Sequence, residues 1–194
     1  MIILITGPSG AGKSSFIDEL MAGDDRLAFS VSTTTRPMRS GEAQGVDYDF
    51  VSDSVFDQLV SEDAFVEWAH VHDNRYGTRR SYLDRMIAAG KIPVLDIDGQ
   101  GGVNVLGQFG TELVSVFIFP PSWEELERRL TSRGTDSPQI IATRLANARQ
   151  EVGFAQYYTY WIVNDDFQEA VGRMRAIITA QECRRDAFPD RPLS

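Results

Sequence analysis

The chain has 194 residues, of which 42% are hydrophobic, and its formal net charge is −9 at pH 7. This length fits one α/β unit with small insertions, while the acidic balance argues against a protein that coats nucleic acid, because phosphate attraction needs a basic face. The single cysteine, Cys183, excludes an internal disulfide. The first apolar run has no basic segment before it, and no apolar stretch reaches membrane-spanning length. We therefore expect a cytoplasmic protein with no membrane or nucleic-acid partner.

The chain begins with a short apolar run, residues 2–5, that predicts a buried strand. The segment behind this run fits the pattern G-x-x-x-x-G-K-[ST] and leads into helical spacing over residues 14–21. Glycines let backbone N–H groups converge on phosphate oxygens, and the start of the helix adds its positive dipole end. Lys13 would reach the outer phosphates and the Ser14 hydroxyl would help to hold Mg²⁺, so the motif predicts a nucleoside triphosphate site. The loop and its continuation comprise Gly7, Pro8, Ser9, Gly10, Ala11, Gly12, Lys13, Ser14 and Ser15.

The next segments depart from a simple alternation of strands and helices. After an expected strand at residues 29–32, residues 33–78 are polar and rich in turns, with strand-like pieces at 48–51 and 65–71. We interpret residues 33–78 as a small subdomain inserted over the strand ends, where the ligands of such sheets bind.

Two arginines in this inserted segment suggest what it binds. Arg36 and Arg39 stand three residues apart among hydroxyl side chains, a layout that suits a dianionic phosphate. Tyr48 and Tyr76 would add phenolic hydrogen-bond donors. The segment therefore predicts a second phosphate site, for an acceptor.

The remainder of the chain alternates between helical spacing and short runs rich in Ile, Val and Phe, which are typical of strands buried on both faces of a parallel sheet. Ser122 followed by Glu125 is a capping box, and Pro120-Pro121 ends the strand before it. The pattern predicts an α/β fold with a parallel core sheet. The expected elements are strands at 92–97, 113–119 and 160–163, and helices at 79–89, 122–132, 140–152 and 167–185.

Residues 128–149 carry five arginines and contain a turn at Gly134. A mobile lid that closes on phosphates would need such a concentration of positive charge. A solvated helical hairpin would show the same composition, and the charge pattern alone does not separate the two alternatives.

Taken together, these features resemble the guanylate kinases. The matching blocks stand in the family's order and spacing over nearly the whole chain: GPSGAGKSS, FSVSTTTRPMRSGEAQGVDYDFVS, FVEWAHVHDNRYGT, VLDIDGQG, RRLTSRGTD and IVNDD. The resemblance implies a P-loop NTPase-like three-layer fold and transfer of the γ-phosphoryl group of ATP to GMP with Mg²⁺. It also implies a core (1–32, 79–120 and 150–194), a GMP-binding subdomain (33–78) and a helical lid (121–149).

The resemblance also implies roles for individual residues. Around GMP, it places phosphate contacts at Arg36, Arg39, Tyr48 and Tyr76, and contacts to guanine and its sugar-phosphate at Ser32, Glu67 and Thr78. Asp96 and Asp98 match the acidic pair that serves Mg²⁺ and the guanine side, with the assignment between them left open; Ser14 and Asp96 are the candidate Mg²⁺ ligands, directly or through water. The catalytic residues would be Lys13 and the lid arginines Arg129, Arg133 and Arg144, and Asn164 matches the residue near adenine.

Glu67 can explain a preference for guanine. Guanine offers N1–H and N2–H₂ on one edge, and an ionised carboxylate accepts both, whereas AMP would leave the buried carboxylate unpaired. Two positions depart from the family pattern: Arg75 replaces a common tyrosine, and Gly99 replaces a common larger apolar residue. We expect either departure to adjust the acceptor pocket.

Two other functions fit parts of the pattern. Guanylate-kinase-like modules of scaffold proteins bind phosphopeptides without catalysis, but they typically lack a working phosphate loop. A phosphate-loop kinase acting on a sugar phosphate would not need Ser32 and Glu67 at a guanine edge. A comparison of GMP, AMP and sugar phosphates as acceptors separates these alternatives.

Overall fold

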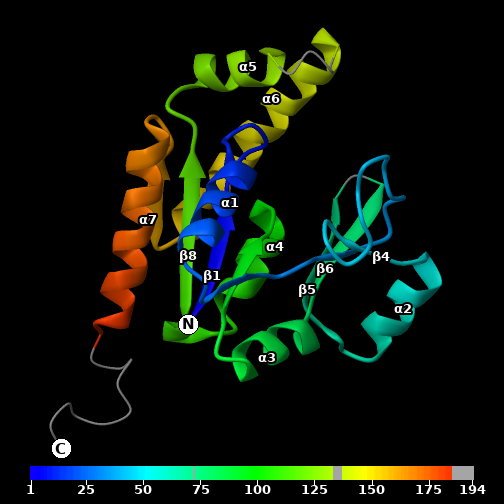
Figure 1. Cartoon of the computed structure of the whole chain (residues 1–194). Coiled ribbons are helices and arrows are strands. Elements are labelled where there is room, and N and C mark those ends of the chain that lie inside the picture. The colour runs from blue at the N-terminus through cyan, green and yellow to red at the C-terminus, as the bar shows by residue number, and fades with distance from the viewer. Residues whose placement is uncertain (72, 133–136, 185–194) are drawn as a thin grey trace, which may run out of the picture.

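The computed structural model describes residues 1–71, 73–132 and 137–184. Its core is a five-stranded sheet in the order β2-β7-β1-β8-β9, in which neighbouring strands pair in parallel. Sequentially distant strands therefore lie side by side, and helices make the crossovers between them (Figure 1). The core strands are β1 (Ile2–Thr6), β2 (Leu27–Phe29), β7 (Ile92–Asp96), β8 (Leu113–Phe119) and β9 (Tyr160–Val163).

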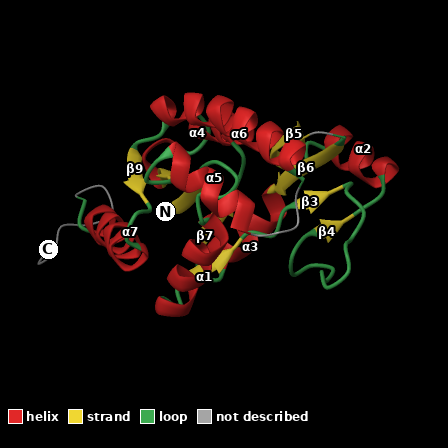
Figure 2. Cartoon of the chain, turned by 90° about the horizontal axis from the view of Figure 1, so that it is seen from above, coloured by secondary structure: helices red, strands yellow, loops and turns green. Residues whose placement is uncertain are grey.

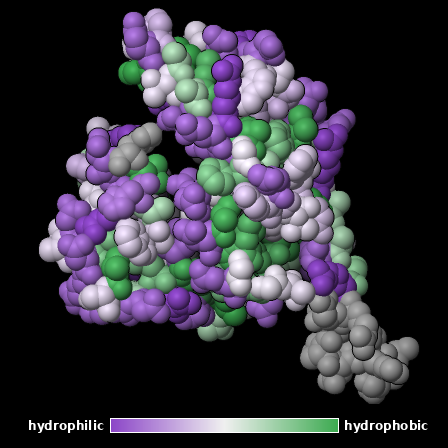
Figure 3. All heavy atoms as spheres, turned by 180° about the vertical axis from the view of Figure 1, so that it is seen from behind, coloured by the Kyte–Doolittle hydropathy of each residue, from purple (hydrophilic) through white to green (hydrophobic). Residues whose placement is uncertain are grey.

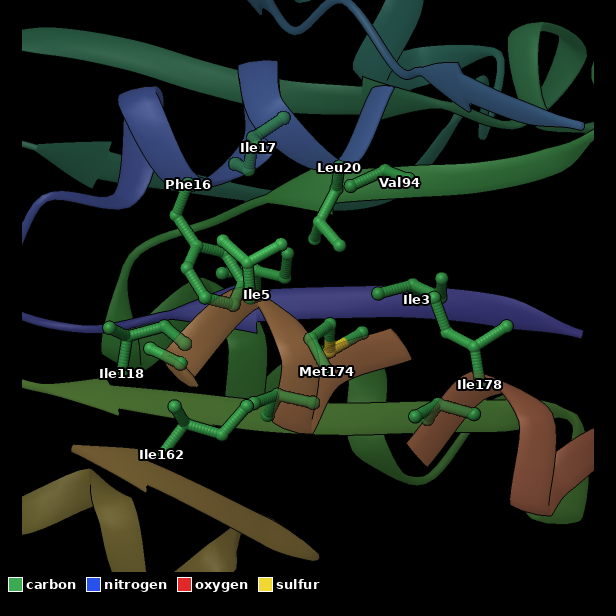
Figure 4. Packing of buried hydrophobic residues seen from close by; sticks show 14 of the residues in the cluster. Ile3, Ile5, Phe16, Ile17, Leu20, Val94, Ile118, Ile162, Met174 and Ile178 are labelled. Carbon is green, nitrogen blue, oxygen red and sulfur yellow. The ribbon is translucent and has the colours of Figure 1, made fainter. Parts of the chain in front are cut away.

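Helices cover both faces of this sheet. Ile3 and Ile5 of β1 pack with side chains of α1 and α7 on one face (Figure 4). Ile2 and Leu4, which alternate with them, pack on the other face with side chains of α3 and α4. The predicted three-layer α/β arrangement is therefore confirmed. The helices are α1 (Lys13–Gly23), α2 (Asp53–Ser61), α3 (Arg80–Ala88), α4 (Gly99–Leu106), α5 (Trp123–Ser132), α6 (Pro138–Val152) and α7 (Phe167–Glu182), with 3-10 turns η1 (Gly110–Glu112) and η2 (Gly153–Tyr157).

A second, four-stranded sheet is inserted between β2 and α3, in the order β4-β3-β6-β5. Its strands are β3 (Thr33–Thr34), β4 (Asp49–Phe50), β5 (Phe65–Val71) and β6 (Asn74–Arg79). Helix α2 packs on it through stacked rings of Phe56 and Phe65, whose centroids are 4.6 Å apart. Seen from above, this small sheet and α2 lie at one end of the molecule, and α7 lies at the other (Figure 2).

Helices α5 and α6 form a third part above the core. Leu126 and Leu130 of α5 pack with Ala148 of α6. The Ser122 Oγ accepts a hydrogen bond from the backbone N–H of Glu125 at 3.1 Å, as the capping box predicts. Within the part of the chain that the structure describes, none of the helices has the length and apolar character needed to cross a membrane.

Most predicted elements of the core are confirmed within a few residues, but one strand is displaced. The strand expected at residues 29–32 is β2, which spans Leu27–Phe29. Its ladder with β7 ends at the pair Phe29↔Val94, and the chain then turns away into the inserted sheet. Elements that the sequence did not predict are α2, β3, β6 and α4.

Candidate active site

The loop between β1 and α1 has a backbone that glycine makes possible. Gly12, just before α1, has φ +91°, in the left-handed region. Its neighbour Lys13 donates from Nζ to the carbonyl oxygen of Gly7 at 2.6 Å. From behind the loop, Asn164 donates from Nδ2 to the carbonyl oxygen of Ala11 at 2.8 Å. These contacts fix the loop at the carboxyl edge of the core sheet, between β1 and the start of α1.

A cavity of ≈ 370 Å³ lies next to this loop. Its walls come from three parts of the chain: the loop and the ends of the core strands, the inserted sheet, and the end of α6. The surface is hollowed between the lobe of the inserted sheet and that of α5 and α6, and mostly hydrophilic side chains form the rim (Figure 3). The lining residues are Gly7, Ser9, Lys13, Ser32, Tyr48, Glu67, Ala69, Val71, Tyr76, Asp96, Ile97, Asp98 and Glu151.

Four of these lining residues are absent from the sequence-based predictions. Ala69 and Val71 follow Glu67 at every second position of β5, so the two-residue period of a strand places them on the same face. That period is a signal by which they could have been found. Glu151 lies near the end of α6, where it accepts a hydrogen bond from the Ser9 N–H at 3.3 Å, and we find no sequence signal for it.

One part of the cavity lining is a buried carboxylate. Glu67 is 8% exposed, and Thr78 donates from Oγ1 to its Oε1 at 2.8 Å. Burial raises the pKa of Glu67 to about 7, and the nearby charge of Asp98 adds to this rise while the Thr78 hydrogen bond opposes it. A Cβ atom on Gly101 would lie 2.9 Å from Glu67 Oε2 and 3.4 Å from Asp98 Oδ1. Two acidic groups therefore converge over one glycine.

Another part of the lining combines an ammonium group with a carboxylate. Burial raises the pKa of Asp96, at the end of β7, while the positive charge of Lys13 opposes the rise. Asp98, two residues further, caps α4: its Oδ1 accepts the Gly101 N–H at 2.8 Å. The charges of Lys13 and Asp98 both act on Asp96, and Asp98 also acts on Glu67, so the cavity lining combines an ammonium group with several carboxylates.

A buried chain of hydrogen bonds leads from Tyr158 to the backbone between Asp96 and Asp98. Tyr158 donates from Oη to Thr6 Oγ1 at 2.8 Å, and Thr6 donates from Oγ1 to the carbonyl oxygen of Ile97 at 2.8 Å. Ile97 separates the two aspartates in sequence. Burial raises the pKa of Tyr158 to about 12, so its hydroxyl stays protonated as a donor at neutral pH. The chain therefore ties the strand before the phosphate loop to the segment that carries both aspartates.

The inserted sheet brings an arginine and two tyrosines together. Arg36 is 8% exposed, and its guanidinium carbon lies 5.1 Å from the ring centroid of Tyr48. The Tyr48 and Tyr76 rings meet edge to face with centroids 5.8 Å apart. Both tyrosines line the cavity, whereas Arg39 is exposed on the surface.

Several predicted residues lie outside the cavity lining. Arg129 of α5 donates to Glu125 Oε1 at 2.7 Å and to the Asn164 carbonyl oxygen at 3.1 Å, and Arg144 lies half-exposed on α6. Arg133 falls outside the described residues. The other predicted residues that the cavity lining does not include are Pro8, Gly10, Ala11, Gly12, Ser14, Ser15, Arg36, Arg39, Thr78 and Asn164.

The two departures from the family pattern, Arg75 and Gly99, have close neighbours outside the cavity lining, and the expectation that either adjusts the acceptor pocket stays a prediction. Arg75 forms ion pairs with Asp53 and Asp57 of α2 at 2.7 and 2.5 Å. A Cβ atom on Gly99 would lie 2.4 Å from Phe154 Cδ2, so this glycine makes room for a neighbouring ring. Neither residue lines the cavity.

These features define a class of protein. A phosphate loop at the carboxyl edge of a parallel sheet, beside a cavity lined by an ammonium group and carboxylates, is the arrangement of a P-loop α/β protein that binds nucleoside phosphates.

Comparison with known proteins narrows this class. The family model for guanylate kinase matches residues 1–181. A guanylate kinase of Zymomonas mobilis subsp. mobilis is 44% identical over 185 residues, which cover 95% of this chain and 86% of that protein. One of a Polaromonas species is 45% identical over 186 residues, covering 96% and 90%. A crystal structure of guanylate kinase from Anaplasma phagocytophilum superposes with a TM-score of 0.78 at 33% identity, covering 95% and 87%. The chain belongs to the guanylate kinase family, and its fold is P-loop NTPase-like.

Proposed function

We propose that this protein transfers the γ-phosphoryl group of ATP to GMP, giving ADP and GDP, in the cavity beside the phosphate loop. It is an ATP:GMP phosphotransferase, a nucleoside monophosphate kinase. The observation that supports this proposal best is that Lys13 of the phosphate loop and the buried carboxylate of Glu67 line the same cavity. A polyphosphate needs positive charge, and the N–H groups of a guanine base need a hydrogen-bond acceptor. A cytoplasmic location, and the division into core, GMP-binding subdomain (33–78) and lid (121–149), belong to the same proposal.

The carboxylates of Glu67 and Asp98 would recognise the guanine base. Glu67, held by Thr78, would accept hydrogen bonds from N1–H and N2–H₂ of guanine. Asp98 lies near Glu67 and would assist it, which supports assigning Asp98 to guanine and Asp96 to Mg²⁺. Ser32 lines the same cavity and would contact the nucleotide there.

The phosphate loop and the basic side chains would hold the phosphates. The loop N–H groups and Lys13 would bind those of ATP, and Arg36, Tyr48 and Tyr76 would bind that of GMP, with Arg39 at the rim. Arg129, Arg133 and Arg144 would supply further positive charge from the lid, and Asn164 would support the loop near adenine.

The donor atoms beside the phosphate loop suit Mg²⁺. Mg²⁺ prefers oxygen ligands and is commonly held by one or two carboxylates together with substrate phosphates and water. Asp96 offers a carboxylate beside Lys13, and Ser14 offers a hydroxyl at the start of α1. When bound, the ion would neutralise charge on the transferring phosphoryl group.

The reaction needs no general base from the protein. The second pKa of a phosphate monoester is about 6, so GMP carries a deprotonated nucleophilic oxygen at neutral pH. Catalysis then consists of aligning the two nucleotides and of balancing the charge on the migrating group. Lys13 and the lid arginines would balance the charge on the migrating group, and the walls of the cavity would keep water from it.

The test is product analysis with ATP, Mg²⁺ and one acceptor at a time. With GMP we expect ADP and GDP in equal amounts, and little ADP with a sugar phosphate. Turnover of a sugar phosphate without GMP turnover would favour a sugar-phosphate kinase. Nucleotide binding without transfer to any acceptor would favour a binding module.

A further inference from the structure

Glu42 has no role in the proposal above, although it lies among residues that would bind the acceptor phosphate. Its Oε1 accepts a hydrogen bond from Arg36 Nη2 at 2.7 Å, and its Oε2 accepts one from Arg36 Nη1 at 3.0 Å. Oε2 also accepts the backbone N–H of Arg39 at 2.7 Å. The side chains of Arg36 and Glu42 are 9% and 19% exposed, so this is a bidentate pair largely shielded from water.

The hydrogen bonds of Arg36 show which edge of the guanidinium Glu42 occupies. Arginine has five side-chain N–H groups. The edge formed by Nη1 and Nη2 meets Glu42, and the second Nη1–H donates to the carbonyl oxygen of Pro37 at 2.9 Å. The geometrically defined hydrogen bonds of Arg36 among the described residues leave Nε–H and the second Nη2–H, which form a second fork on another edge of the same plane, and the Tyr76 hydroxyl lies near the guanidinium.

The surroundings of Arg36 indicate where this second fork is used. Tyr76 lies close enough to the guanidinium to raise the pKa of Arg36, after the larger effect of Glu42. The ring centroids of Tyr48 and Phe50 lie 5.1 and 5.5 Å from the guanidinium carbon. Two of these three aromatic neighbours, Tyr48 and Tyr76, line the cavity, so the guanidinium lies next to the cavity wall.

An internal carboxylate beside an anion site can act in two opposite ways. It can compete with the ligand for the arginine, or it can hold the arginine in the geometry that the ligand needs. The hydrogen-bond geometry favours the second, because Glu42 uses one edge of Arg36 and does not occupy the other fork. A long arginine side chain that is already fixed loses less rotamer freedom when an anion binds.

We propose that Glu42 is a positioning residue for the acceptor phosphate: it holds Arg36 by one edge so that the other edge receives the phosphate monoester of the acceptor nucleotide. This inference rests on the proposed function of the same site.

The test replaces the carboxylate and separates binding of phosphate from binding of the base. Glu42→Gln keeps the shape but offers one acceptor oxygen and turns an NH₂ group toward the other Arg36 N–H. We expect the KM for GMP to rise about tenfold, with kcat at saturating GMP within about twofold of the wild type. The inhibition constant of guanosine, which has no phosphate, should not change.

The matched control is Asp47→Asn in the same loop. The Asp47 carboxylate accepts the Ala43 N–H at 2.8 Å, and its recorded hydrogen bonds do not include Arg36. We expect its KM for GMP to stay at the wild-type value. A second check is the pair Arg36→Ala and Arg36→Ala/Glu42→Gln: once Arg36 is gone, loss of Glu42 should raise the KM no further.

Three results would overturn the inference. A lower KM for GMP in Glu42→Gln would show that the carboxylate competes with the phosphate. An unchanged KM would show that it does neither. An equal loss of GMP and guanosine binding would show a general structural effect. If the wild type did not transfer phosphate to GMP, the proposed function would fail, and calorimetric binding of GMP and guanosine to the same variants would still decide the role of Glu42.

Discussion

The raised pKa of Glu67 makes GMP binding depend on pH in a way that can be worked out. With a pKa of about 7, roughly one Glu67 carboxyl in eleven is ionised at pH 6, and roughly ten in eleven at pH 8. Only the ionised form accepts both N–H groups of guanine. We therefore expect the dissociation constant of GMP to fall about tenfold from pH 6 to pH 8 through this group.

The assay is calorimetric titration with GMP at pH 6, 7 and 8 and constant ionic strength, on the wild type and Glu67→Gln. The phosphate of GMP also titrates near pH 6, but it does so equally in both proteins. The ratio of the two dissociation constants therefore isolates the carboxyl group. A ratio that stays constant between pH 6 and pH 8 would refute the assignment of Glu67 to guanine in its ionised form.

The same shift has a consequence for stability. The folded protein keeps the Glu67 proton up to about pH 7, while the unfolded chain releases it near 4.5, so the favourable contribution is present below pH 4.5 and lost as the pH rises through 7. The loss amounts to ~3 kcal/mol at 1.36 kcal/mol per unit. We therefore expect the difference in unfolding free energy between Glu67→Gln and the wild type, measured in urea, to shift by this amount in favour of the variant from pH 4.5 to pH 8. An equal difference at both pH values would contradict the buried, titrating state of the group.

Three further substitutions test separate parts of the molecule. Lys13→Ala should abolish phosphoryl transfer while lowering the unfolding free energy by only about 1 kcal/mol, since its side chain makes one recorded hydrogen bond; near-normal turnover would contradict the phosphate-loop assignment. Gly102→Ala would place a Cβ atom 1.9 Å from Tyr158 Oη, so it should lower the unfolding free energy in urea by about 1–3 kcal/mol. Adding Tyr158→Phe should restore part of that loss, and additive effects of the two substitutions would argue against this contact. Arg75→Ala should lower the melting temperature through loss of its contacts with α2 and leave the KM for GMP unchanged, and a raised KM would return this residue to the acceptor site.

The core of the fold was predictable because its signals are local. Strands such as β1 and β8 are continuous apolar runs, and the phosphate loop has a fixed spacing between a strand and a helix. Helix α4 was missed because three of its eight residues are glycines, which argue against a helix. Two of its glycines are required by residues distant in the sequence: a Cβ atom on Gly99 would meet the Phe154 ring, and one on Gly102 would meet the Tyr158 hydroxyl. Such tertiary contacts leave no periodic trace in the sequence.

The site shows the same division between local and distant information. Lys13 could be named from the fixed spacing of the phosphate loop, and Asp96 and Asp98 from the resemblance to the guanylate kinases. The structure brings all three to one cavity. Glu42 and Glu151 could not be named from the sequence. The contact of Glu42 with Arg36 depends on side-chain conformation, and that of Glu151 with Ser9 joins segments far apart in the chain. The guanidinium edge that Glu42 occupies is a property of rotamers, which sequence spacing does not encode.

The most direct test of the function is the ratio of kcat/KM for GMP to that for AMP, measured with ATP and Mg²⁺ on the wild-type protein. AMP lacks the N1 proton and the C2 amino group that Glu67 would bind, and sites built to bind such groups reject analogues without them by about 10⁴–10⁵. We expect a ratio in that range, with one GDP formed for each ADP. Comparable turnover of AMP, or ADP release that does not depend on GMP, would contradict a GMP kinase whose buried carboxylate selects guanine.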